Sequence, residues 1–192
     1  MKKKDLIHER GAFVKIFELE ENQILIEGTL TDERFCRSFI YSLQRLVDPD
    51  VIHRITVRMT LSLPKLIIES AEAEMPAVPV GMCREIKDVV HKLIGLRLTR
   101  GFKDKVKKLF GGRNGCIHMT NLILFMSTAA IQGSYTFYNR VREDGRLKHP
   151  DFDDSLIINS CHVWSEDGSF AARLVEMKKA AESVRAEKTG RK

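Results

Sequence analysis

Alternation of apolar and polar residues predicts the clearest element of this chain, a strand from His53 to Leu61. Every second residue in it is apolar, so one face would be buried and the other would face water. His53 falls on the apolar side of that alternation. Residues 12–19 and 23–30 flank a polar turn and predict a hairpin. A further strand is predicted from Leu66 to about Met75.

The middle of the chain changes to a helical period. Apolar residues recur at helical spacing from Met82 to Leu96, and a shorter basic helix ends at Gly111-Gly112. A third helix is predicted from about Cys116 to Gln132, with Gly133 as a point where it either stops or continues to Arg140. We therefore expect an α+β fold, in which an antiparallel sheet of about four strands in the N-terminal half packs against three helices.

Length and composition predict one domain spanning residues 1–192. The chain has 192 residues, 43% of them hydrophobic and 30% charged, which is typical of a globular protein. Residues 1–11 and 180–192 are expected to be flexible basic tails. No apolar run is long enough to span a bilayer, and no apolar segment follows the basic N-terminus, so we expect a cytoplasmic protein without membrane contact.

The net charge of +6 raises the question of an anionic partner. Few aromatic residues interleave the basic patches, so we do not expect nucleic acid to be that partner. The basic segment 100–113 predicts instead a site for an anionic small molecule or an acidic protein. Its candidate residues are Arg100, Lys103 and Arg113, beside a glycine-rich turn.

The four cysteines lie far apart and are expected to be free thiols. Cys83 and Cys116 each stand where a predicted helix begins, a position that favours the thiolate. We therefore predict a metal or sulfur site built from these two cysteines with His53 or His118. Further candidate ligands come from a predicted strand over residues 156–164: Cys161 and His162.

A thiol enzyme is the third alternative. In it, Cys116 would be the nucleophile and His118, two residues later, its general base. A metal site, an anion-binding accessory protein and a thiol enzyme all remain open on the sequence.

Several short motifs resemble a bacterial family labelled only as a domain of unknown function: Ile26 to Asp32, Gly95-Leu96, Gly101-Phe102 and Gly115-Cys116-Ile117-His118. That family implies no activity. The order of His53, Cys83 and Cys116 also resembles the three ligand positions of NifU/IscU-type iron–sulfur scaffolds, with a histidine in place of the first cysteine. This second resemblance implies a scaffold-like core with a mixed nitrogen and sulfur site for zinc or iron.

Overall fold

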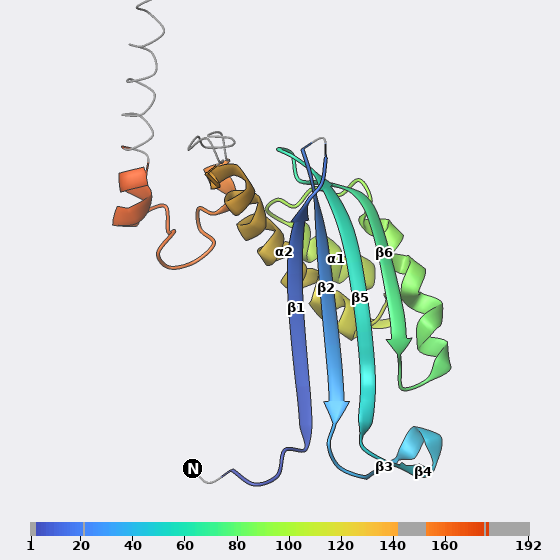
Figure 1. Ribbon diagram of the computed structural model, residues 1–192. Helices are drawn as coiled ribbons and strands as arrows, with labels where there is room; N and C mark the ends of the chain where they lie inside the picture. The colour runs from blue at the N-terminus through green and yellow to red at the C-terminus, as the bar shows by residue number, and fades with distance from the viewer. Residues whose placement is uncertain (1–2, 21, 142–152, 175, 177–192) are drawn as a thin grey trace, which may run out of the picture. The chain divides into compact units, whose positions relative to one another are not determined.

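A four-stranded antiparallel sheet with the order β1-β2-β5-β6 forms the centre of the larger part of the chain (Figure 1). The computed structural model describes residues 3–20, 22–141, 153–174 and 176. The sheet consists of β1 (His8–Glu18), β2 (Gln23–Arg34), β5 (Asp50–Ser62) and β6 (Ile67–Ala77). The predicted α+β class and the four-stranded antiparallel sheet are thereby confirmed.

The chain between β2 and β5 contains both a small hairpin and a short helix. Strands β3 (Ser38–Ile40) and β4 (Arg45–Val47) pair with each other, and the 3-10 helix η1 (Tyr41–Leu43) connects them. Gln44 has a φ of 49°, which turns the chain back into β4. This segment therefore contains two kinds of structure that follow one another.

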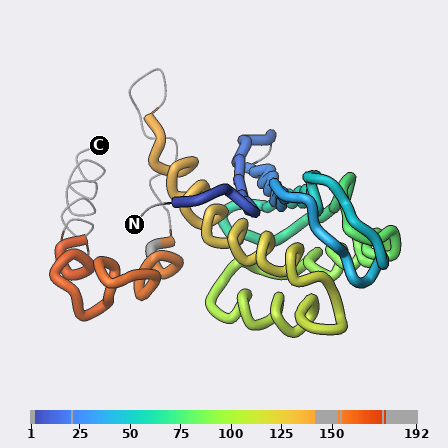
Figure 2. Tube along the Cα trace, turned by 90° about the horizontal axis from the view of Figure 1, so that it is seen from below, coloured from blue at the N-terminus to red at the C-terminus, as the bar shows by residue number. Residues whose placement is uncertain are grey.

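The helices gather on one face of the sheet, as the view along the sheet in Figure 2 shows. They are η2 (Gly81–Leu93), α1 (Phe102–Phe110), η3 (Gly112–Asn114) and α2 (Ile117–Asn139). Helix α2 contacts β1, β2 and β5, and α1 packs on α2. The first predicted helix is present at nearly the predicted place, but it has 3-10 hydrogen bonding.

Helix α2 continues past Gly133, and this glycine lets the helix pack closely on the sheet. A side chain there would overlap the side chain of Ile16 on β1, so the missing Cβ lets the helix lie close to the sheet. Gly28 on β2 has the same role from the other side, because a Cβ at Gly28 would overlap Met126 of α2. The two glycines bring α2 down onto the first two strands.

The buried core lies between the inner face of the sheet and these helices. The alternating residues of β2 and β5 supply its sheet side, and helices α1 and α2 supply the other. Fully buried examples are Ile26, Val57, Met59, Phe110 and Met119. The predicted apolar face of the strand beginning near His53 is thus the core face.

Residues 151–192 form a second compact unit, separate from residues 1–150. Its described part starts with the 3-10 helix η4 (Asp154–Leu156) and contains turns stabilised by hydrogen bonds between Asn159 and Glu166. The prediction of a strand over residues 156–164 is wrong, because this segment folds as consecutive turns. Residues 169–174 are helical, and the predicted tail 180–192 lies outside the described residues.

The last residues of the predicted tail 1–11 belong to a strand. Strand β1 begins at His8, so the end of the segment 1–11 pairs with β2. The organisation of residues 1–192 as one domain stays a prediction. Within the described residues, no helix has the length and apolar character needed to cross a membrane.

The close approach of α2 to the sheet predicts a large effect of Gly28→Val. The added side chain would overlap Met126, and overpacking of this kind lowers the free energy of unfolding by about 1–3 kcal/mol. Urea denaturation measures the change. Gly81→Ala is the matched control, because nothing lies within 4 Å of a Cβ at that position; equal losses for both variants would contradict the packing role of Gly28.

Candidate functional site

A buried carboxylate, that of Asp32, lies on the inner face of the sheet near the end of β2. Asp32 continues the inward alternation of Ile24, Ile26 and Leu30, and its side chain is only 1% exposed. It stands directly opposite Arg10 on β1 and His53 on β5 in the strand register. Side chains opposite one another on one face of a sheet are close enough to bond, so three polar residues form a row across three strands.

Arg10 binds both oxygens of the Asp32 carboxylate. Its Nε donates to Oδ1, and its Nη2 donates to Oδ2 at 2.7 Å. The Nε2 atom of His8 lies 3.4 Å from Oδ1. This two-point contact is the geometry in which arginine binds carboxylate most strongly, and it fixes the orientation of the carboxylate.

His53 approaches the same carboxylate from the other side. Its Nδ1 lies 3.0 Å from Oδ2 of Asp32, and its side chain is 14% exposed. The pairing of β2 with β5 shifts register just beyond this pair, because Asp32 faces His53 whereas Glu33 faces Val51. Ile52 is therefore an extra residue in β5, and such a bulge bends a strand and redirects its side chains.

The third member of the group comes from the first turn of α2. The turn before this helix is held close to α1, because the Thr120 hydroxyl lies 2.9 Å from the carbonyl oxygens of both Phe110 and Cys116. A side chain at Gly115 would collide with the Phe110 backbone. These contacts place His118 over the sheet, with its Nε2 at 3.4 Å from Oδ2 of Asp32.

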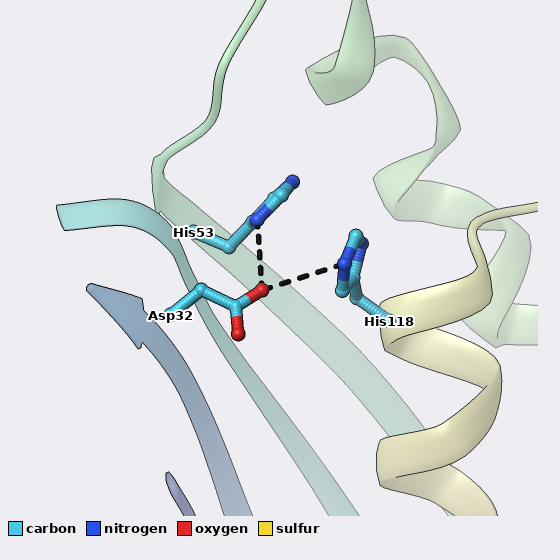
Figure 3. Close-up of side chains that lie close together, drawn as sticks. All are labelled: Asp32, His53 and His118. Carbon is cyan, nitrogen blue, oxygen red and sulfur yellow. Dashed lines mark hydrogen bonds and ion pairs between the residues drawn. The ribbon is translucent and has the colours of Figure 1, made fainter. Parts of the chain in front are cut away.

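Asp32, His53 and His118 can therefore offer three ligand atoms to one metal ion. The three atoms lie within 4.8 Å of one another, and both histidines point at the same carboxylate oxygen (Figure 3). Ligands at about 2.0–2.2 Å from a zinc ion are about 3.3 Å from one another, close to the 3.0 and 3.4 Å measured from Oδ2. Two imidazoles and one carboxylate are a common ligand set for catalytic zinc and for non-haem iron.

The protonation states of Asp32, His53 and His118 are suited to binding a metal ion. Burial alone would raise the pKa of Asp32, but the hydrogen bonds and charge of Arg10 outweigh it and hold the pKa below the ordinary 3.8. Burial lowers the pKa of His53 and of His118 below 6.5. The centroids of the two rings lie 3.9 Å apart, with the ring planes tilted by 32°, and the charge of His53 adds to the lowering of the His118 pKa. Near neutral pH the group therefore holds one charged carboxylate and two neutral imidazoles.

Cys116 lies beside this group without being part of it. It is the N-cap residue of α2, and its Sγ is 3.7 Å from Nδ1 of His118, the ring nitrogen that faces away from Asp32. The two residues of the predicted Gly-Cys-x-His pair thus touch one another. The thiol contacts the histidine where an outer partner of a metal-bound imidazole would be.

The other predicted ligands are Cys83 in the first unit and Cys161 and His162 in the second. Cys83 lies at the start of η2, where its backbone N–H donates to the Val80 carbonyl oxygen. Cys161 and His162 are exposed residues of the second unit. Of the predicted site residues, the structure therefore brings His53 and His118 together, and Cys116 contacts His118.

The predicted anion site is an exposed surface. Its three residues lie around α1 and η3 and are exposed: Arg100, Lys103 and Arg113. No hydrogen bond or ion pair joins them to one another among the described residues. Binding of an anionic ligand by this segment stays a prediction.

Asp32 is a candidate ligand that the sequence patterns did not single out. The motif Thr31-Asp32-Glu33 reads as a polar end to the second strand. The signal was nevertheless present, because Asp32 keeps the two-residue spacing from Leu30 and so must face the core. A charged residue at such a position requires a partner, which an alternation analysis extended by two residues would have identified.

The chain belongs to the family described as "Protein of unknown function (DUF2889)", whose model matches residues 8–132. The match covers the sheet, α1 and most of α2, and therefore every residue of the Asp32 group. No curated protein and no solved structure matches the chain, so the comparisons lend no support to a NifU/IscU-type core. The family defines the class of the protein without assigning a reaction.

The depressed pKa values predict that metal-free protein loses stability as the pH falls. Below pH 6.5 the unfolded chain takes up protons at both histidines while the folded chain resists them, so acid favours unfolding. Asp32 adds a further loss below its unfolded pKa of 3.8, as the pH falls through the folded value. We expect the free energy of unfolding, measured by urea titration in chelator, to decline from pH 7 to pH 5.

A double variant, His53→Gln with His118→Gln, should flatten that decline because the two titrating rings are gone. His91→Gln is the control, since His91 is exposed on η2 and outside the group. An unchanged slope in the double variant would show that other groups cause the pH dependence.

Proposed function

We propose that this protein binds a divalent transition metal through Asp32, His53 and His118, and that the metal is the centre of its function. One observation carries the proposal: three separate elements, β2, β5 and α2, each deliver one ligand atom to the same small volume. A charged residue on the core face of a strand lowers stability unless it is compensated, and such residues are frequent at functional sites.

The neighbours of the three residues fit the proposal. Metal-bound histidines and carboxylates commonly bond to a second layer of groups that fixes their orientation. Arg10 donates to Oδ1 of Asp32 through Nε and to Oδ2 through Nη2, and Oδ2 also faces both imidazoles. When His118 binds through Nε2, its proton resides on Nδ1, which can donate to the Cys116 sulfur at 3.7 Å.

The ligand set favours zinc or iron(II) among common metals. Three protein ligands leave at least one position for water or substrate, as catalytic zinc sites do. The same set with two or three open positions is that of non-haem iron oxygenases. Calcium and magnesium are disfavoured, because they prefer oxygen ligands and two of the three groups here are imidazoles.

Metal titration of protein prepared without a histidine tag tests the proposal. Chelator-treated protein should bind one zinc or cobalt(II) ion per chain, and His53→Ala and His118→Ala should each weaken binding by about 100-fold or more, because each removes a ligand. Competition with a chromophoric chelator measures the affinity. Affinity should also fall in acid, as the pH drops through the lowered pKa values of the two imidazoles and protons compete with the metal.

His91→Ala is the matched control for this titration and should bind metal as the wild type does. Absence of binding in the wild type, or equal binding in all variants, would overturn the proposal. Far-UV circular dichroism of each variant separates loss of a ligand from loss of fold.

A second candidate function is thiol chemistry at Cys116. Sγ of Cys116 lies 3.7 Å from Nδ1 of His118, and Nε2 of the same ring lies 3.4 Å from Oδ2 of Asp32. The three side chains are therefore arranged as a nucleophile, a base and a carboxylate that orients the base. This order is that of thiol and serine hydrolases. In this version His118 accepts the thiol proton, and Asp32 stabilises the resulting imidazolium.

Alkylation kinetics distinguish this second function. In metal-free protein, iodoacetamide should modify half-buried Cys116 faster than exposed Cys36 at pH 7, and His118→Ala should slow it about tenfold or more by removing the base. Mass spectrometry of the labelled peptides measures both rates. A rate at Cys116 below that at Cys36 and unaffected by His118→Ala would exclude an activated thiol.

A further inference from the structure

A cavity of about 450 Å³ opens beside the end of β2, next to the Asp32 group. The β3–β4 hairpin covers one side of it, and the start of β5 and residues 78–79 form the rest. Its lining is mixed: aliphatic side chains, among them Ile40, Val47 and Val51, share it with charged ones, among them Arg45 and Asp50. A volume of this size holds a small organic molecule, whereas an inorganic anion would leave the walls without contacts.

Two cations line this cavity, Arg34 and Arg45, and neither has a carboxylate partner among the described residues; Arg34 is the one with a buried donor atom. Its Nη2 donates to the carbonyl oxygen of Asp48 at 2.9 Å, but its Nε is buried and has no acceptor. A buried donor without an acceptor is costly and rare, so it indicates a missing partner.

Two acidic residues, Asp48 and Asp50, also line the cavity. Oδ1 of Asp48 lies 3.4 Å from Nε of Arg37, and Oδ1 of Asp50 accepts the backbone N–H of Val51 at 2.7 Å. Among the described residues no ion pair joins either carboxylate to Arg34, so its guanidinium is available to an external anion. Carboxylates match its planar arrangement of donors.

We propose that this cavity binds a small carboxylic acid with an apolar body, whose carboxylate pairs with Arg34 and whose body lies against the aliphatic walls. Arg34 is two residues beyond Asp32 on the same face of β2, so their Cα atoms are about 7 Å apart. Val51 and Ile52 of the cavity directly precede His53 on β5. The acid therefore lies beside the metal ligands; its role as the substrate of that centre rests on the proposed function.

Ligand titration of the full chain tests the binding site itself. Octanoate carries both features, acetate has the charge without the body, and octanol has the body without the charge. NMR titration or calorimetry should show octanoate binding at least about tenfold more tightly than either control compound, because only octanoate satisfies both parts of the cavity.

Three variants locate the binding. Arg34→Met should weaken octanoate binding about tenfold or more, and Arg34→Lys should weaken it less, because lysine keeps the charge but loses the planar donors. Arg54→Met is the matched control, because Arg54 is an exposed arginine of β5 that does not line the cavity. Equal binding of octanoate, octanol and acetate, or no effect of Arg34→Met in folded protein, would overturn the inference.

Separate measurements keep this inference distinct from the metal proposal. Octanoate binding that depends on Arg34 but persists in chelator supports the cavity even when no metal binds. Metal binding without octanoate binding overturns the cavity and leaves the metal proposal intact. Where both bind, manganese(II) should broaden the octanoate proton signals in the wild type and not in His53→Ala; no broadening in the wild type would show that the acid lies away from the metal.

Discussion

The buried charge of Asp32 is the constraint on which the site depends. A carboxylate on the core face of a sheet would lower stability by several kcal/mol if it were unpaired. Arg10 opposes it with charge and hydrogen bonds, and His53 lies on its other side. Asp32 depends above all on Arg10, because removing that side chain would leave the buried carboxylate without its charged partner.

The same interactions give the two oxygens of the Asp32 carboxylate different surroundings. Oδ1 faces Arg10 Nε and His8, whereas Oδ2 faces the two imidazoles and accepts from Arg10 Nη2. A bound cation at Oδ2 would compete with that last hydrogen bond but not with the contact at Oδ1. Affinity for metal would then reflect a balance between Arg10 and the ion, which makes Arg10 a positioning residue with an opposing charge.

The inner face of the sheet changes from apolar to polar along its length, and the candidate site lies at the polar end. Toward the β1–β2 turn the inner face is filled by aliphatic side chains under α2, where Gly28 and Gly133 allow close contact. Toward the other end it carries Asp32 and Arg34 on β2 and a bulge at Ile52 on β5. The rigid apolar part supports the polar part, so the functional groups sit on fixed elements rather than on loops.

Local periodicity alone determined most of the fold. Alternation in β5 and helical spacing in α2 are properties of neighbouring residues, so the strands, the helices and their antiparallel sheet follow from sequence. His53 and His118 were identified because histidines at buried or helix-start positions need partners. The partnership itself depends on tertiary structure, because Asp32 meets His53 through strand register and His118 through the packing of α2. Sequence spacing carries no information about which distant residues meet, and that is why Asp32, rather than Cys83, completes the group.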